Sequence, residues 1–171
     1  MGHPDGMDHD PNLRGRLPRL SPKPVVAAVV VGIDGSVTSW HAFWWACGES
    51  SRLGGRAVAV FVGPTAGVAS AAASASLGGA VTPYVACQQT MAELAQALGD
   101  QVHEYAHDHL VNLTFVHTQG DTARELLRIA DGNLADLIVV GRSTKARHHL
   151  AGSLGRRLLG RREAPIIVVV P

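Results

Sequence analysis

The chain contains five short runs of apolar residues, rich in valine and isoleucine, in which apolar and polar residues hardly alternate. Runs of this kind are typical of strands that are buried on both faces, as the strands of a parallel sheet are. Strands with one face in water would alternate instead. We therefore expect parallel strands at residues 25–33, 57–62, 112–117, 137–140 and 165–170.

Amphipathic stretches with a helical period separate these runs. The first of them follows Asp34-Gly35-Ser36, a segment that is typical of a helix N-cap. Its apolar stripe consists of Trp40, of Phe43 or Trp44, and of Cys47. Helices are expected at residues 36–53, 82–110, 122–133, where Thr122 to Glu125 form a capping pattern, and 153–161.

Strands that alternate with helices predict an α/β fold, here a three-layer, doubly wound, parallel five-stranded sheet. Crossovers between parallel strands are right-handed, so helices must cover both faces. If the first three strands wind outward and the fourth returns beside the first, the strand order is 3-2-1-4-5. Ligands in such sheets bind at the carboxyl ends of the strands where the winding reverses. Here this crevice lies between Ile33-Asp34-Gly35 and Val140-Gly141-Arg142.

The length of 171 residues predicts one domain with a substantial core. Residues 1–22 are rich in Pro, Gly, Asp, Arg and His and have no periodicity, which predicts a flexible arm before a domain at residues 23–171. The arm lacks the apolar segment of a signal peptide, and Cys47 and Cys87 show no pairing motif. These features indicate reduced thiols and the cytoplasm. A net charge of +1 argues against nucleic acid and membranes as partners.

Three segments together resemble the universal stress protein domain: Val29 to Ser36, Asp136 to Gly141 followed by a loop and Gly152-Ser153, and Pro165 to Val170. They occur in the family's order and spacing, and the resemblance covers residues 25–171. It implies a Rossmann-like, adenine nucleotide alpha hydrolase-like fold and a regulatory or ligand-sensing role in stress response. It also implies a homodimer that forms through the last strand, Ile166 to Val170.

The position of the last strand favours the same homodimer on physical grounds. In the order 3-2-1-4-5 this apolar strand lies at a sheet edge, and an apolar edge is a template for pairing with another chain. The alternative is an edge that Pro171, the twist of the sheet and the flanking helices protect.

Some members of the family bind ATP, and their pattern maps onto this chain residue by residue. Asp34 falls where such members place an acid near the ribose, and Val62 where a backbone group meets the adenine. Gly141 matches the first glycine of the phosphate loop, and Gly152-Ser153 match the Gly-Ser that opens the last helix. The resemblance thus implies ATP or another adenine nucleotide as the ligand, with Mg²⁺ only when nucleotide is bound. Asp34 has a second interpretation, as a turn or N-cap residue before the first helix.

The phosphate loop departs from the family pattern at two points. Thr144 replaces the second loop glycine, and residues 145–151 form a shorter spacer than the family has. A β-branched residue does not take positive φ without strain, so the usual path around a triphosphate is disfavoured. Cationic side chains before a helix N-terminus offer another way to hold an anion. These side chains, which otherwise form a solvated face, are Arg142, Lys145, Arg147, His148 and His149.

Two hypotheses therefore stay open for the function. In the first, the crevice binds an adenine nucleotide or another anionic ligand and the chain is a sensor. In the second, the crevice is vestigial and the chain is a homodimeric interaction protein that contacts protein partners.

His103-Glu104-Tyr105-Ala106-His107 matches the His-Glu-x-x-His pattern of zinc hydrolases. A catalytic zinc needs a third protein ligand, and no glycine and histidine follow at the required spacing. The helical period turns His103 and His107 away from the apolar face, so we expect an exposed pair and no metal site. The P-loop, dinucleotide-binding and nucleophile-elbow patterns are also absent, so we assign no catalytic residues and do not predict turnover chemistry.

Overall fold

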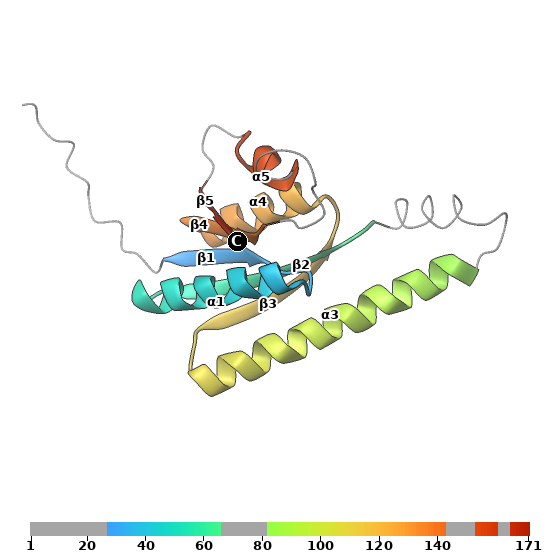
Figure 1. Ribbon diagram of the computed structural model, residues 1–171, viewed down its shortest axis with the longest axis horizontal. Helices are drawn as coiled ribbons and strands as arrows, with labels where there is room; N and C mark the ends of the chain where they lie inside the picture. The colour runs from blue at the N-terminus through green and yellow to red at the C-terminus, as the bar shows by residue number, and fades with distance from the viewer. Residues whose placement is uncertain (1–26, 66–81, 143–152, 161–164) are drawn as a thin grey trace, which may run out of the picture.

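The chain folds into a five-stranded parallel sheet with helices on both faces (Figure 1). The computed structural model describes residues 27–65, 82–142, 153–160 and 165–171, so the predicted arm at residues 1–22 lies outside the described residues. The spatial order β3-β2-β1-β4-β5 confirms the predicted α/β fold and strand order. The strands are β1 Ala28–Gly32, β2 Arg56–Gly63, β3 Leu113–Gln119, β4 Leu137–Gly141 and β5 Ile166–Val170.

The helices form the two outer layers. They are α1 Val37–Arg52, α3 Thr82–His109, α4 Thr122–Asn133 and α5 Ser153–Leu158. Helices α1 and α3 pack on one face of the sheet, and α4 and α5 pack on the other (Figure 1). Over the four described stretches of chain, no helix combines the length and the apolar character that crossing a membrane requires.

The core has two halves because successive residues of a strand face opposite sides of the sheet. Val29 and Val31 of β1 pack with α1 and α3, whereas Val30 packs with α4 and α5. The α1/α3 half contains the buried ring of Phe43, and the α4/α5 half is centred on aliphatic side chains such as Leu126. Full burial of one such side chain contributes roughly 2–3 kcal/mol to stability.

The prediction that all strands are buried on both faces is correct in the centre of the sheet and wrong at its edges. Strands β1 and β4 are buried over most of their length. In β3, Thr114, His117 and Gln119 are exposed, and in β5, Ile166 and Val169 are exposed. An edge strand has a neighbouring strand on one side only, so some of its side chains reach water.

Helix α1 begins where the sequence predicts. Ser36 is the N-cap, and its Oγ accepts a hydrogen bond from the backbone N–H of Ser39 at 3.2 Å. Of the two candidates for the apolar stripe, Phe43 is fully buried, whereas Trp44 is 50% exposed. Phe43 therefore belongs to the core, and Trp44 lies at the surface.

The range predicted for α4 is confirmed, but its predicted cap is wrong by one residue. Asp121, not Thr122, is the N-cap, and its Oδ1 accepts a hydrogen bond from the backbone N–H of Arg124 at 3.0 Å. A carboxylate at this position satisfies a free N–H group and also interacts favourably with the positive end of the helix dipole.

Cys47 is the buried cysteine of α1 and carries a free thiol, as expected. Burial raises the pKa of this thiol to about 12. Cys47 therefore stays protonated at neutral pH and packs as a small apolar residue.

Candidate ligand site

The winding of the sheet reverses between β1 and β4, as predicted. The two strands pair in parallel, with Gly32 opposite Val140. The N–H of Ile33 still donates to the carbonyl oxygen of Val60 at 2.9 Å, so the pairing with β2 continues one residue beyond β1. The carboxyl ends of β1 and β4 thus lie side by side. We call residues 32–36 and 140–142 the switch point.

Glycine occupies the carboxyl ends of four neighbouring strands. Strands β1, β2 and β4 end at Gly32, Gly63 and Gly141, and Gly120 directly follows β3. The N–H of Gly120 donates to the carbonyl oxygen of Gly63 at 3.0 Å, which keeps these two strand ends together. A residue without a Cβ lets another molecule approach the backbone closely. This edge of the sheet is therefore suited to a ligand.

These glycines do not all serve the same purpose. A Cβ on Gly141 would meet the backbone of α1, against the carbonyl oxygen of Thr38 and 2.7 Å from the N of Ser39. The packing of β4 against α1 thus requires glycine at this position. A Cβ on Gly32 or Gly63 would make ordinary contacts, with nearest atoms at 3.4 and 3.5 Å. Packing does not require glycine at these two positions.

Asp34 is exposed and lies in the tight turn that joins β1 to α1. Its Oδ1 accepts a hydrogen bond from the N–H of Ser36 at 3.0 Å, and its own N–H donates to the Oγ of Ser39 at 3.3 Å. Gly35 makes the turn possible with a φ of +82°. The interpretation of Asp34 as a turn residue is confirmed, and its role near a ribose stays a prediction.

The structure describes some of the other predicted ligand residues and not others. Val62 is half-buried in β2 and packs against the α4/α5 half of the core. Arg142 has an exposed side chain, and its backbone N–H donates to the carbonyl oxygen of Val170 at 2.8 Å. Strand β5 therefore fixes the backbone from which the Arg142 guanidinium extends. Lys145 and Gly152 lie outside the described residues, and Ser153 is placed as the first residue of α5.

Sequence reasoning missed a polar cluster at the carboxyl end of β3. The Oγ1 of Thr118 donates to the Oε2 of Glu125 at 3.1 Å, and the Nε of Arg128 donates to the same oxygen at 2.9 Å. Arg128 and, more weakly, Thr118 hold the pKa of the Glu125 carboxyl below its ordinary value. The capping pattern pointed to Glu125, but no local signal pointed to Thr118.

A second missed contact connects α4 with α5. The Nη2 of Arg157 pairs with the Oδ2 of Asp121 at 2.6 Å. Arg157 and the backbone N–H of Arg124 hold the pKa of the Asp121 carboxyl below its ordinary value. The two side chains come from distant parts of the sequence, so no spacing rule predicts their contact. The charge of Arg157 is compensated within the fold.

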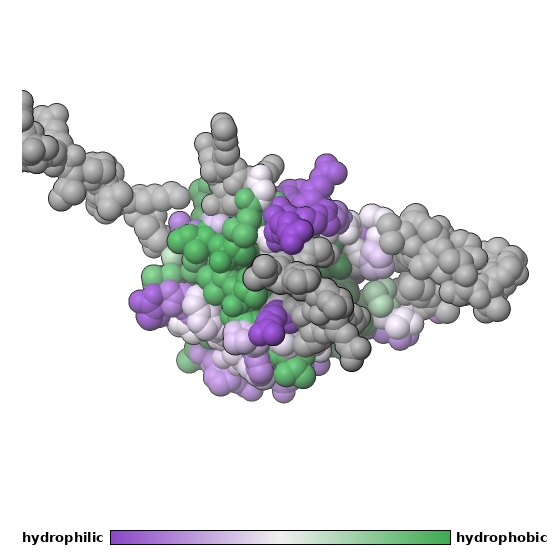
Figure 2. Space-filling view, turned by 45° about the horizontal axis from the view of Figure 1, so that its top comes forward, coloured by the Kyte–Doolittle hydropathy of each residue, from purple (hydrophilic) through white to green (hydrophobic). Residues whose placement is uncertain are grey.

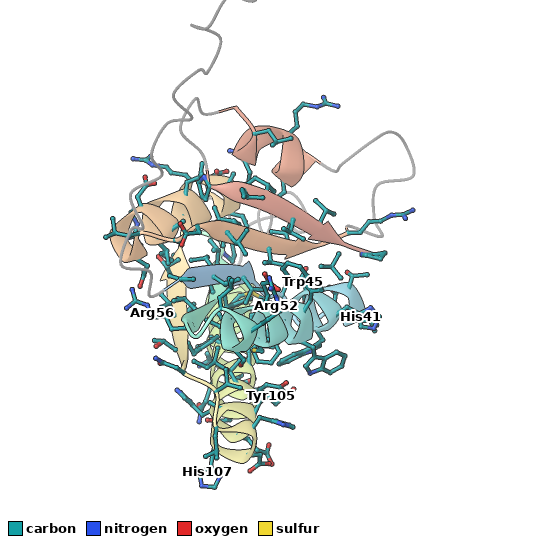
Figure 3. All side chains as sticks on the ribbon, turned by 90° about the vertical axis from the view of Figure 1, so that its left-hand side faces the viewer. His41, Trp45, Arg52, Arg56, Tyr105 and His107 are labelled. Carbon is teal, nitrogen blue, oxygen red and sulfur yellow. The ribbon has the colours of Figure 1, made fainter. Side chains whose placement is uncertain are left out.

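The two histidines of the His-Glu-x-x-His segment lie on exposed positions of α3. His103, Glu104 and His107 are all exposed, as predicted, and Figure 3 shows His107 pointing away from the rest of the molecule. The Nδ1 of His107 lies 3.1 Å from the Oδ1 of its neighbour Asp108. Among the residues that the structure describes, no three or more His, Cys, Asp or Glu side chains are grouped so as to hold a metal ion.

The profile of the universal stress protein family matches residues 27–170. This match spans the whole sheet and the switch point, so the chain belongs to the universal stress protein family. No curated protein matches the chain in sequence.

Solved structures of family members share the fold at low sequence identity. A protein from the universal stress protein family of Burkholderia pseudomallei has a TM-score of 0.66 at 22% identity, over 88% of this chain and 99% of that chain. A universal stress protein in complex with cAMP has a TM-score of 0.52 at 22% identity, over 85% of this chain and 97% of that chain. A family protein from Arabidopsis thaliana with AMP bound has a TM-score of 0.57 at 13% identity, over 85% and 92% of the two chains.

Proposed function

We propose that this chain binds an adenine nucleotide at the switch point and acts as a ligand-sensing regulator in stress response. The observation that supports this proposal most is the set of glycine strand ends. Packing does not require Gly32 and Gly63, yet both leave the backbone at the carboxyl edge of the sheet without a side chain. Two solved relatives that contain cAMP and AMP add support.

Polar groups that suit a nucleotide lie at the switch point. The carboxylate of Asp34 is an acceptor for ribose hydroxyls, and the guanidinium of Arg142 is a bidentate donor for a phosphate. Val62 supplies backbone groups for the adenine, and Lys145, Gly152 and Ser153 complete the phosphate side. Thr144 and the short spacer disfavour the usual path around a triphosphate. We therefore expect AMP or cAMP to bind more tightly than ATP, with Mg²⁺ taken up only together with ATP.

Isothermal calorimetry of the full chain, freed of co-purified ligand, tests this proposal with AMP, cAMP and ATP plus Mg²⁺. We expect micromolar binding, which corresponds to about −8 kcal/mol. Asp34→Ala should weaken it by about tenfold or more, because a hydrogen bond to a charged group contributes roughly 1.5–3 kcal/mol. Asp131→Ala is the matched control, since Asp131 lies in the last turn of α4, at the other end of the sheet. No heat with any of the three nucleotides up to millimolar concentration would favour the interaction-protein hypothesis.

A charge reversal separates the phosphate contact from the adenosine contacts. We expect the double variant Arg142→Glu, Lys145→Glu to lose AMP binding and to keep its affinity for adenosine, which has no phosphate. Arg52→Glu is the control, because Arg52 lies in the last turn of α1, at the other end of the sheet. An equal loss of AMP affinity in the control would mean that net charge causes the effect. It would contradict a phosphate contact in this loop.

We further propose that two copies of the chain pair through β5. This edge strand exposes Val169 and 67% of Ile166, and Figure 2 shows apolar side chains gathered over this part of the surface. Trp45, which is also exposed, lies one helical turn from His41 on α1. The Nδ1 of His41 contacts the carbonyl oxygen of Pro171 at 3.3 Å, so this part of α1 lies beside the end of β5.

Sedimentation analysis of the full chain tests this pairing. We expect a dimer for the wild type and a monomer for Val169→Lys, because a lysine on an apolar edge opposes strand pairing. Leu110→Lys is the control, since Leu110 is exposed after α3 and lies away from β5. A monomeric wild type, or a dimer that survives Val169→Lys, would contradict the proposal.

A further inference from the structure

A pocket of about 350 Å³ lies between α1 and α3 and includes no residue of the switch point. Its volume is in the range of small-molecule sites, roughly 300–1,000 Å³. Trp40, Phe43 and Trp44 of α1 and Tyr105 of α3 supply aromatic walls. Figure 3 shows Tyr105 close below α1, on the side of α3 where the two helices meet.

Three of the aromatic rings that line this pocket, those of Trp40, Phe43 and Tyr105, form a connected set. Phe43 contacts Trp40 edge to face at 5.2 Å between ring centroids, and it contacts Tyr105 edge to face at 5.1 Å. Phe43 is fully buried and forms the floor, whereas Trp44 is 50% exposed. A large aromatic side chain that remains half in water beside other aromatic rings is typical of a binding surface.

The charges around the pocket are negative. Glu104 and Asp108 of α3 line it, and none of its eight lining residues is lysine or arginine. The Asp108 carboxylate also contacts His107, whose ring points outward. His109 lines the pocket, and its ring packs tilted against that of Tyr105 at 4.2 Å between centroids. Carboxylates beside aromatic faces attract a cation and repel a phosphate.

We propose that this pocket binds a small organic cation with a quaternary or otherwise alkylated ammonium group. The faces of Trp40, Trp44 and Tyr105 contact its alkyl groups, and Glu104 and Asp108 supply the opposite charge. An alkylated ammonium fits better than an inorganic cation, because its apolar surface gains from burial and it gives up little hydration. The pocket and its ligand are independent of the nucleotide site.

Choline and its neutral carbon isostere, 3,3-dimethyl-1-butanol, test the need for charge. Both are titrated into the full chain while tryptophan fluorescence is followed, and calorimetry confirms the affinity. We expect saturable binding of choline and at least about tenfold weaker binding of the alcohol. Equal affinities for choline and the alcohol would show that the pocket recognises apolar surface alone, which would contradict the proposed role of charge. The absence of a saturable response to choline would overturn the proposal.

Two pairs of variants assign the effect to the pocket. Trp44→Leu keeps an apolar side chain and should weaken choline binding about tenfold, whereas Trp45→Leu, the neighbour with 41% exposure outside the pocket, should not. The double variant Glu104→Gln, Asp108→Asn should also weaken binding. The double variant Glu93→Gln, Asp100→Asn, which removes two exposed carboxylates of α3 outside the pocket, is its control. Losses of equal size in either control would overturn the assignment.

A third ligand distinguishes a free small cation from a basic side chain of a protein. N-acetyl-arginine amide presents a planar guanidinium at the end of a peptide-like stem. We expect it to bind more weakly than choline. Tighter binding than choline would overturn the proposed ligand class and assign the pocket to an arginine of a protein partner.

Discussion

The two ends of the parallel sheet are built differently, although the same strands and helices meet at both. At the carboxyl end the chain turns with glycine: Gly35 has a φ of +82° and Gly120 a φ of +150°. At the amino end, where α1, α3 and α4 finish, the left-handed positions are held by Gly54, Leu110 and Leu134. A leucine in this conformation costs about 1–2 kcal/mol that glycine avoids.

The amino end is also closed by the chain's own contacts. The Nη2 of Arg56 donates to the carbonyl oxygen and to the Oδ1 of Asn133, each at 3.2 Å. A Cβ on Gly55 would meet the carbonyl oxygen of Ala27, so the backbone is tightly packed there as well. At the carboxyl end, Gly32 and Gly63 have room for a Cβ that the sequence does not supply. This difference supports our proposal that the carboxyl end binds a ligand, whereas the contacts of the amino end serve stability.

The largest expected effect concerns Gly141, the carboxyl-end glycine that packing requires. Gly141→Ala should destabilise the fold by about 2–3 kcal/mol, because the new Cβ forces α1 away from β4. Gly32→Ala should change stability by less than about 1 kcal/mol, since its Cβ has an ordinary contact distance. Urea unfolding followed by circular dichroism measures both. Equal losses of stability in the two variants would mean that packing, and not a ligand, explains why both positions at the carboxyl end are glycine.

Substitutions of Asp121 test how far the stability of the carboxyl end depends on charge. Asp121→Ala should cost about 1 kcal/mol at pH 7, because it removes the N-cap of α4. Asp121→Asn keeps a capping side chain and removes the ion pair with Arg157. The folded pKa of Asp121 is lowered, so the charge contribution is fully present above the unfolded value, about 3.9, and is lost as the pH falls through the folded pKa.

Thermal unfolding between pH 7 and pH 2 checks this dependence. The difference in Tm between wild type and Asp121→Asn should shrink below about pH 4. Asp131→Asn, at the other end of α4, is the control. A difference that stays constant over the whole range would show that the pair with Arg157 contributes no stability.

The smallest expected effect concerns the amino end. Leu134 is the C-cap of α4, is exposed, and has a φ of +51°. Leu134→Gly should stabilise the chain by roughly 0.5–1 kcal/mol, because glycine adopts this conformation without strain. Leu53→Gly is the control, since Leu53 caps α1 with a φ of −83° and should gain nothing. A loss of stability in Leu134→Gly, measured by urea unfolding, would contradict this view of the amino end.

The features that the sequence predicts well are those with local signals. The valine and isoleucine runs predict each strand, and the serine at position 36 predicts the start of α1. The alternation of strands and helices predicts the strand order and the switch point, and both are confirmed.

The features that it does not predict depend on tertiary neighbours. Phe43 and Trp44 are adjacent in α1, so a small rotation of the helix decides which one is buried. The partner of Asp121 is Arg157, which only the packing of α4 against α5 brings near. The prediction that the edge strands are fully buried is wrong, because a sequence pattern does not show that a strand lacks a neighbouring strand on one side.

The central claim, that the carboxyl end is the ligand-binding end, is tested most directly by the glycine amides. A titration of ¹⁵N-labelled full chain with AMP, followed by heteronuclear correlation spectra, reads both ends of the sheet at once. We predict progressive shifts of the Gly32, Gly63 and Gly141 signals, with those of Gly54 and Gly55 unchanged. Shifts confined to Gly54 and Gly55, or no shift of any glycine signal at millimolar AMP, would contradict the account.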